Sequence, residues 1–349
     1  MLSIRSTFYI LFLSSSLLFS QSTISGRVID SETQKPLPYA NVFLSKTTIG
    51  ASSDLDGYFR VENVPNGSYE LVVQYLGYEL VVFNITILEK KSFQLSVKLK
   101  PKPLEGKEIV IEAPDNKWWR KRFKEFKEQF LGFTENAQQS EIINPLSINF
   151  YEDRSDNYVA TCDSCLIVEN RSLGYKINIV LQHFEWNKTK CYHRTYSKFN
   201  ESEPESEDEY QRWLKNREKT YKGSFKHFFS SLLTYHKDIV NYKIFLTHEK
   251  IYKSKGLYYP ISKNYLYEFI SDSIGLKKIK LEDFLYITYN DGSKEMEAGF
   301  VLKGKEKYLL LDNLGTVMNP IQSKRYGYWG YLRFADLLPD DYQPVINNN

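Results

Sequence analysis

The sequence is poor in cysteine, in histidine and in long apolar runs. Its 349 residues include three cysteines and five histidines. Beyond residues 1–20, no apolar run approaches the roughly 20 residues that a membrane-spanning helix needs. The sequence therefore predicts no membrane-spanning segment after residue 20.

An excess of one charge sign is also lacking. The chain carries 46 Lys and Arg residues against 43 Asp and Glu residues, a formal net charge of +3. This balance argues against nucleic acid as an obligate partner, because phosphate recognition relies on concentrated positive charge. Hydrophobic residues make up 42% of the chain, which excludes disorder, and the length suits about two domains.

Sequence motifs of several enzyme classes are absent. There is no H-E-x-x-H, H-x-x-E, G-x-S-x-G, Walker loop or G-x-G-x-x-G. Metalloproteases and carboxypeptidases, serine esterases and nucleotide-binding enzymes that carry these motifs lose support, and we expect no cofactor. Glycosidases stay open, because their two carboxylates meet in space and leave no fixed spacing in the sequence.

Residues 1–20 have the pattern of a secretory signal peptide. Arg5 precedes the apolar run Phe8–Leu13, and the small residue Ser20 ends the segment. We expect cleavage after Ser20, a mature chain that begins at Gln21, and no transmembrane span in that chain. The predicted location is the periplasm, the outer membrane or the cell surface.

Three cysteines leave at least one thiol without an intramolecular partner in an oxidising compartment. Cys162 and Cys165 flank a two-residue turn, which brings their Cα atoms into disulfide range, so a local disulfide is favoured. A zinc site is the sharper alternative, with Cys191 and His193 as further ligands. Unpaired core thiols are the third interpretation.

Residues 21–100 predict a compact β-sandwich. Apolar residues alternate with polar ones in short runs such as Phe93–Leu99, which indicates half-buried strands. Turn residues separate the runs, as at Asp56-Gly57 and Leu76-Gly77. About seven strands fit into the segment, a number typical of a small sandwich.

These segments resemble the carboxypeptidase regulatory-like domain. The resemblance rests on Ile24–Asp30, Pro36–Phe43, Thr47–Gly50, Ser53–Phe59, Val64–Tyr69 and Tyr75–Tyr78. It implies a transthyretin-like sandwich of the kind found in exported Bacteroidota proteins. Segments further along, from Trp119-Arg120 to Ala335–Tyr342, resemble a C-terminal region of unknown function that follows this domain in that phylum. The predicted fold class is mainly β and multidomain, with an α+β domain after the sandwich.

A proline-containing linker, residues 101–115, and an amphipathic helix, residues 116–133, are expected after the sandwich. Asn116 is placed as the N-cap and Gly132 as the terminator. The apolar side chains Trp119, Phe123, Phe126 and Phe130 recur at helical spacing, and the opposite face is basic. Binding to a membrane surface stays open, but a docking helix with a solvated basic face is favoured.

Residues 134–345 are predicted to form the α+β domain. Strands alternate up to about residue 198, helices follow at Glu207–Thr220 and Ser224–Asp238, and strands resume near residue 243. The acidic run Glu201–Glu209 is interpreted as a solvated loop, because Pro204 and the lack of a glycine turn do not suit a calcium loop.

Aromatic residues are abundant, with 27 tyrosines. The cluster Tyr326, Tyr328, Trp329 and Tyr331 is a possible ligand platform for a sugar ring. Core packing is the favoured alternative, with Trp329 buried and the other rings divided between core and surface.

Together these observations predict an exported, non-enzymatic accessory or binding protein of a Gram-negative cell envelope. Its expected partner is an envelope protein or a glycan. A glycan hydrolase with unidentified carboxylates is one alternative, which two carboxylates about 5 to 10 Å apart in a pocket would favour. A purely structural module is the other, which the lack of a large pocket would favour.

Overall fold

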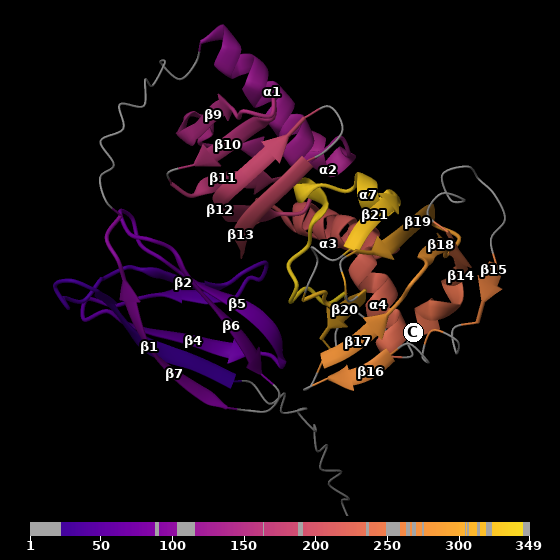
Figure 1. Ribbon diagram of the computed structural model, residues 1–349, viewed down its shortest axis with the longest axis horizontal. Helices are drawn as coiled ribbons and strands as arrows, with labels where there is room; N and C mark the ends of the chain where they lie inside the picture. Colours follow the sequence, from indigo (N-terminus) through magenta and orange to yellow (C-terminus); the bar gives the residue numbers. More distant parts are fainter. Residues whose placement is uncertain are drawn as a thin grey trace, which may run out of the picture.

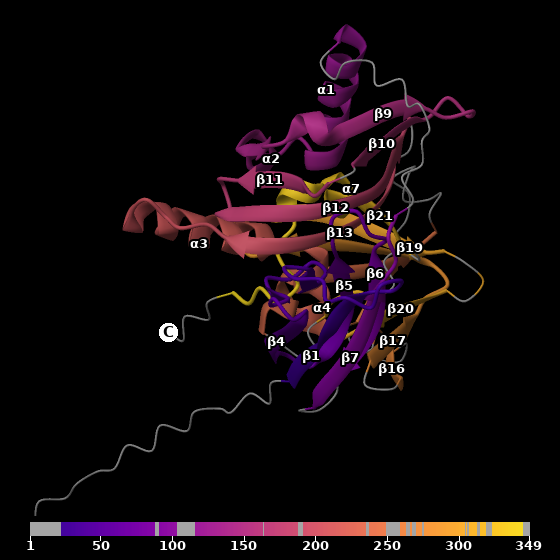
Figure 2. The same ribbon diagram turned by 90° about the vertical axis from the view of Figure 1, so that its left-hand side faces the viewer.

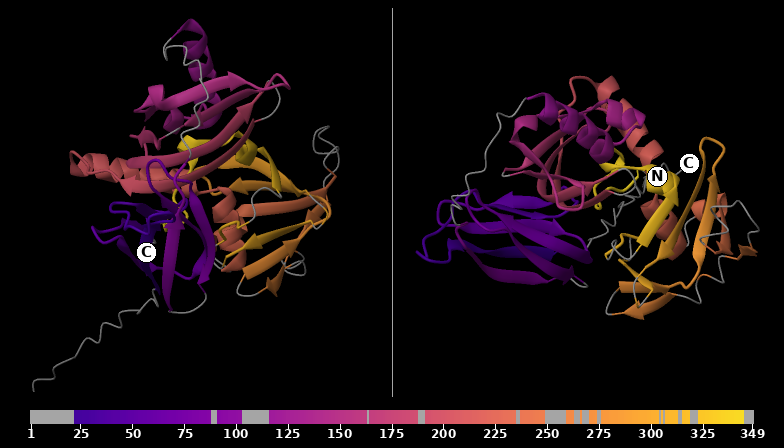
Figure 3. Two further views of the ribbon diagram at one scale, coloured as in Figure 1. Left: turned by 60° about the vertical axis from the view of Figure 1, so that its left-hand side comes forward. Right: turned by 45° about the horizontal axis from the view of Figure 1, so that its top comes forward.

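The computed structural model is mainly β and consists of three bodies, each with its own hydrophobic core (Figure 1). It describes residues 22–344 except 88–90, 103–115, 163, 188–190, 235–236, 249–258, 263–265, 267–269, 274–275, 304, 306, 313–314 and 319–322. The predicted signal peptide, and most of the predicted linker, lie outside these residues. No helix in the described ranges is long and apolar enough to cross a membrane. Figure 3 shows the three bodies side by side from two further directions.

The first body is the predicted β-sandwich. Its strands are β1 (Ser22–Asp30), β2 (Asn41–Leu44), β3 (Gly50–Ser52), β4 (Tyr58–Val64), β5 (Gly67–Gln74), β6 (Val81–Ile87) and β7 (Ser92–Leu99). One sheet has the order β4-β1-β7 and the other β3-β2-β5-β6. Strand β1 runs parallel to β7, and the other pairs are antiparallel.

Local sequence accounts for this sandwich. Burial alternates residue by residue along β1, so that Ile24 and Val28 enter the core while their neighbours do not. The turn before β4 is closed by Asp54, whose carboxylate accepts the backbone N–H groups of Asp56 and Tyr58. Gly57 follows at φ +78°, a conformation that favours glycine.

The middle body packs two helices on one face of a six-stranded sheet. The helices are α1 (Lys117–Leu131) and α2 (Glu135–Gln138), and the 3-10 turn η1 (Pro145–Ser147) precedes the second strand. The strands are β8 (Ser140–Ile142), β9 (Ile148–Glu152), β10 (Tyr158–Cys162), β11 (Leu166–Asn170), β12 (Tyr175–Trp186) and β13 (Cys191–Glu201). The order is β8-β11-β12-β10-β9, with β13 along the other edge of β12.

Helix α1 docks on this sheet through its aromatic side. The Asn116 side chain accepts the N–H of Trp119 at 2.7 Å, and the chain leaves the helix at Gly132 with φ +97°. Phe126 and Phe130 are buried against Phe184 of β12. Figure 2 shows α1 and α2 on one side of this sheet and the sandwich on the other.

The third body is a pair of sheets around helix α4 (Phe225–Leu233). The strands are β14 (Tyr242–Thr247), β15 (Tyr259–Ile261), β16 (Ile270–Ser273), β17 (Leu276–Lys280), β18 (Phe284–Asn290), β19 (Glu295–Leu302), β20 (Tyr308–Leu311) and β21 (Ser323–Gly327). The orders are β15-β14-β18-β19-β21 and β16-β17-β20. The 3-10 turn η2 (Lys237–Asn241) leads into β14.

The region predicted as one α+β domain therefore holds two cores. Helix α3 (Glu207–Tyr221) joins them and is capped by Ser206. The acidic run Glu201–Glu209, predicted as one loop, is a loop only in part: Glu201 ends β13, and the last three acids form the first turn of α3, where the helix dipole favours negative charge. After the third body, α7 (Tyr328–Tyr331) and η4 (Phe334–Asp336) return the chain to the middle body, where Phe334 stacks on Phe130. Phe130 and Phe334 are about two hundred residues apart, and a contact between such distant residues produces no periodic pattern in the sequence.

Residues 339–342, which we name the C-terminal clasp, link the sandwich to the third body. The Asp340 N–H donates to Lys46 O at 2.6 Å. The Thr48 N–H donates to Asp341 Oδ1 at 3.0 Å. Lys226 of α4 donates to the carbonyl oxygens of Asp340 and Tyr342. One short segment thus contacts both the sandwich and helix α4 of the third body.

The sandwich also joins the middle sheet through backbone hydrogen bonds. The Lys46 N–H donates to Ser197 O at 2.6 Å, and the Phe199 N–H donates to Thr47 O at 2.9 Å. Thr47 pairs with Lys198 of β13 as an isolated parallel bridge. The turn after β2 therefore extends the sheet at β13 and fixes the position of the sandwich.

Candidate functional site

A groove of about 870 Å³ separates the sandwich from the middle sheet. We name it the interdomain groove. It is lined by Gln74, Tyr75, Leu76, Gly77, Tyr78, Glu79, Leu80, Lys102, Thr161, Cys162, Ser164, Val180, Leu181, Gln182, His183, Tyr192 and Arg194. Clefts of this size between domains are the usual place for small-ligand binding.

The sandwich wall of the groove is the connection between β5 and β6. Leu76 is 81% exposed at its tip, and Gly77 adopts φ +82° there. The Tyr78 hydroxyl donates to Asp30 Oδ2 at 2.6 Å, and this bond raises the pKa of Tyr78 to about 12. Its ring meets that of Tyr75 edge to face, with centroids 5.2 Å apart. Two tyrosines are thus fixed at the rim.

The opposite wall is the outer face of β12 and β13. Ile177 and Ile179 of β12 point into the middle core, so Val180 and Gln182 point outward. A register shift between Leu181 and His183 changes the alternation there. Tyr192 and Arg194 of β13 occupy the same face, two residues apart.

Several polar side chains are available on this wall. The Tyr192 ring is 46% exposed and lies 6.1 Å from the ring of His183. His183 Nε2 is 3.2 Å from Glu185. Arg194 is exposed. Among the described lining residues, Glu79 is the one carboxylate, so they supply no pair of acids across the groove.

Chemically, the groove offers aromatic faces beside hydrogen-bonding groups. Tyr75, Tyr78 and Tyr192 supply the rings, and the amide of Gln182 and the guanidinium of Arg194 supply polar groups. Such a combination suits a ligand with apolar ring faces and many hydroxyl groups.

The cysteines differ from the predicted local disulfide. Cys162, Cys165 and Cys191 are all free thiols in the structure. Cys162 Sγ donates to Ser147 Oγ at 3.2 Å, while Cys165 Sγ donates to Gln74 Oε1 of the sandwich at 3.6 Å. The two side chains diverge because each contacts a different element, which the spacing alone did not indicate.

The candidate zinc ligands are not brought together either. In the part of the chain that the structure describes, no three His, Cys, Asp or Glu side chains form a group that could hold a metal. The His193 ring stacks on Phe184, with centroids 6.1 Å apart. Burial raises the pKa values of Cys165 and Cys191 to about 11, so these thiols stay protonated at neutral pH.

The aromatic cluster near the C-terminus does not form one platform. Trp329 is 3% exposed, meets Phe225 edge to face and donates its indole N–H to Gly223 O at 2.8 Å. Tyr326 packs on Phe284, and the Tyr328 hydroxyl accepts from Lys294. Tyr331 is 49% exposed. Most of these rings face the core because β21 and α7 cover the third body.

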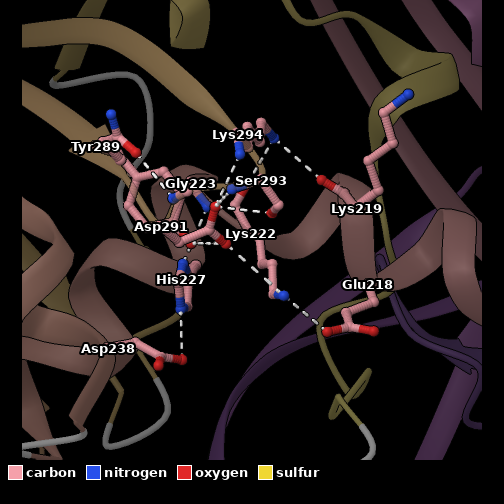
Figure 4. A network of polar contacts seen from close by, with 12 residues as sticks. Glu218, Lys219, Lys222, Gly223, His227, Asp238, Tyr289, Asp291, Ser293 and Lys294 are labelled. Carbon is pink, nitrogen blue, oxygen red and sulfur yellow. Dashed lines mark hydrogen bonds and ion pairs between the residues drawn. The ribbon is translucent and has the colours of Figure 1, made fainter.

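A second polar cluster surrounds His227 and was missed at the level of sequence (Figure 4). His227 lies off the apolar stripe of α4, yet its side chain is 3% exposed. Its Nδ1 accepts the Gly223 N–H at 3.0 Å and lies 2.7 Å from the Tyr242 hydroxyl. With Nδ1 accepting, Nε2 carries the proton and faces Asp238 at 3.3 Å.

This cluster continues to the end of helix α3. Lys294 donates to Lys219 O at 3.0 Å and also to Lys222 O, which satisfies carbonyl groups at the helix C-terminus (Figure 4). Hydrogen bonds from Ser293 and Tyr289 stabilise the Asp291 carboxylate and lower its pKa. These contacts join α3 to the turn between β18 and β19, and we interpret the cluster as structural.

Comparison with known protein families identifies the family of the first body. Residues 24–111 match the family model of the CarboxypepD_reg-like domain. The sandwich is a CarboxypepD_reg-like domain. The match covers the N-terminal part of the chain only, and no curated protein matches the chain.

Solved structures show local likenesses. A cohesin–X-dockerin complex from Acetivibrio cellulolyticus is 22% identical over 23% of this chain and 58% of that chain, with a TM-score of 0.20. The minor pilin of Streptococcus agalactiae is 20% identical over 24% and 46%, with a TM-score of 0.21. The chain thus spans about half the length of these two structures.

A Bacteroides uniformis protein described as carbohydrate-binding is 9% identical over 50% of this chain and 78% of that chain, with a TM-score of 0.20. At such TM-scores, these likenesses establish nothing about the ligand or partner of this chain.

The residues of the interdomain groove carried only weak signals in the sequence. Leu76-Gly77-Tyr78 has the residues of a turn, and the alternation around Tyr192 and Arg194 indicates a strand. Neither pattern shows that the two segments, more than a hundred residues apart, face each other.

Proposed function

We propose that this protein is an exported, non-enzymatic accessory protein of a Gram-negative cell envelope that binds a glycan in the interdomain groove. The observation that carries the proposal is the groove itself, with three tyrosine rings beside amide and guanidinium groups. Sugar rings stack on aromatic faces, and their hydroxyl groups pair with planar polar side chains. Export rests on the signal-peptide pattern of residues 1–20.

The composition of the groove supports binding over hydrolysis. Glycoside hydrolysis uses two carboxyl groups about 5 to 10 Å apart. Glu79 is the single carboxylate among the described lining residues, which favours a binding protein over the competing hydrolase. A cavity of about 870 Å³ likewise favours a ligand-binding role over a purely structural one.

The experiment compares glycan binding by wild type and two single variants. Tyr192→Ala removes the accessible ring of the β13 wall. Taking the value for a ring stacked on an aromatic side chain, about 1–3 kcal/mol, the variant should bind about 5- to 150-fold more weakly. Tyr151→Ala is the matched control, because Tyr151 lies on β9 of the same sheet, is 48% exposed and does not line the groove.

A glycan array identifies the ligand, and calorimetry then gives the dissociation constants of the variants. We expect Tyr192→Ala to bind weakly and Tyr151→Ala to bind like wild type, with both melting temperatures unchanged. Equal glycan affinities of the two variants would exclude the interdomain groove as the binding site. Cleavage of the glycan by wild type would show a hydrolase instead.

A further inference from the structure

Helix α1 carries a basic face that is exposed over most of its length. This face consists of Lys117, Arg120, Lys121, Lys124 and Lys127, which recur at helical spacing opposite the buried aromatic side. The first four are exposed and Lys127 is half-buried. Two acidic residues belong to this helix: Glu125 pairs with Arg122 at 3.0 Å away from this face, and Glu128, four residues after Lys124, is the one acid on it. The face therefore keeps a net positive charge.

The position of these cations opposes the helix dipole. The first turn of α1 has no acidic residue and contains Lys117 and Arg120, although the N-terminus of a helix favours negative charge. Helix α3 of the same protein follows the rule, with Glu207, Asp208 and Glu209 in its first turn. Folding alone therefore does not account for the basic first turn of α1, whereas an anionic partner there would be attracted by both the side chains and the dipole.

We propose that the basic face of α1 binds the surface of an anionic phospholipid membrane. Lys117 to Lys127 span about 15 Å of helix at 1.5 Å per residue, so the charges are spread over a line and not gathered around one ion. Exposed aromatic residues lie at both ends of the helix, Trp118 at 40% and Phe133 at 50% exposure. The apolar side of α1 is packed on the sheet, so the contact would be electrostatic, and the exposed aromatic rings suit the headgroup region of a membrane.

The arrangement of the bodies is compatible with this contact. Helix α1 forms an outer end of the molecule in both Figure 1 and Figure 2. The sandwich lies on the face of the middle sheet opposite to α1 (Figure 2), and the interdomain groove is lined by the sandwich and by β12 and β13. Membrane contact through α1 thus leaves the groove open to its ligand.

The test measures binding to lipid vesicles. The protein, purified after export, is sedimented at low salt with vesicles of phosphatidylcholine and phosphatidylglycerol, and with vesicles of phosphatidylcholine alone. We expect binding to the anionic vesicles only, and its loss at high salt. The triple variant Lys117→Gln, Lys121→Gln, Lys124→Gln should bind about a hundred-fold more weakly, since each cation near such a surface contributes about five-fold.

A second triple variant controls for net charge. Lys35→Gln, Lys98→Gln and Lys176→Gln also removes three exposed lysines, from the sandwich and from β12. We expect this variant to bind like wild type and both triple variants to keep the wild-type melting temperature. Equal loss in the two triple variants would show an effect of net charge alone. That result would overturn the proposal. So would unchanged binding of the α1 variant, and so would a failure of the wild-type protein to sediment with anionic vesicles.

Discussion

The sandwich and the third body are both β-rich, but their cores are built differently. The buried cluster of the sandwich is almost entirely aliphatic, with Phe59 as its one aromatic member. The third body buries aromatic rings from α4, β14, β18, β19 and α7, namely Phe225, Phe228, Phe229, Tyr242, Tyr289, Phe300 and Trp329. Aliphatic residues on alternating strands pack without polar partners, whereas buried hydroxyl, indole and imidazole groups each need one.

The difference affects how the two bodies depend on the rest of the chain. Each strand of the sandwich pairs with others from residues 22–99. In the third body, the indole of Trp329 and the imidazole of His227 both bond to Gly223, which joins α3 to α4. The third body should therefore be more sensitive to single polar or aromatic changes.

The largest effect is expected from Trp329→Ala. Removing this buried ring leaves a cavity beside Phe225 and leaves Gly223 O without its indole donor, so the free energy of unfolding should fall by about 3–5 kcal/mol. Denaturant unfolding measures the change. Tyr331→Ala, at an exposed neighbouring ring, should change it by no more than about 0.5 kcal/mol. Similar values for the two variants would show that Trp329 does not pack as described.

A smaller effect is expected from Tyr242→Phe. The change keeps the ring and removes the hydroxyl 2.7 Å from His227 Nδ1, so unfolding should become easier by about 1–2 kcal/mol. Tyr58→Phe in the sandwich is the control, because Tyr58 is 54% exposed and its hydroxyl can bond to water. The melting temperatures of both variants are compared with that of wild type. Equal changes in the two variants would show that the third body is no more sensitive to the loss of a hydroxyl group than the sandwich.

The clasp between the two bodies should respond to pH. Desolvation raises the pKa of Asp340 to about 6, with Lys46 and Lys226 lowering it in part. The folded protein thus binds a proton here more tightly than the unfolded chain, whose aspartate has a pKa near 3.9. Protonated Asp340 therefore contributes to the free energy of unfolding in full below about pH 4, and this contribution is lost as the pH rises through about 6.

The measurement compares melting temperatures of wild type and Asp340→Asn between pH 4 and pH 7. Since the asparagine of the variant does not titrate, the wild-type melting temperature should rise relative to that of the variant as the pH falls. Parallel curves for the two proteins would show that Asp340 titrates normally in the folded state.

The state of the three cysteines can be tested directly by chemical labelling. Because the structure has three free thiols, alkylation of the unfolded, unreduced protein should label Cys162, Cys165 and Cys191. Mass spectrometry counts the labels. A single label, on Cys191, would restore the local disulfide that the spacing of Cys162 and Cys165 predicted.

Much of the fold follows from local sequence. The alternation along β1 and the Asp54 to Gly57 turn specify parts of the sandwich through neighbouring residues. Asn116 and Gly132 mark the two ends of α1 in the same way. These features depend on interactions between residues close together in the chain, so they can be predicted from one sequence.

The candidate site follows from tertiary structure. Tyr78 and Tyr192 share a groove only because the turn at Lys46 and Thr47 pairs with β13 and holds the sandwich against the middle sheet. His227 is buried because Gly223 and Tyr242 supply its hydrogen bonds, although it lies off the apolar stripe of α4.

The sequence by itself thus determined the sandwich and the ends of α1, since each rests on short-range periodicity, turn geometry or capping. Only the tertiary structure decided the division into two cores after residue 116, the divergence of Cys162 and Cys165, and the faces that form the groove. These depend on which distant surfaces pack together, and that choice minimises the exposed apolar area of the whole chain, a quantity that no local window contains.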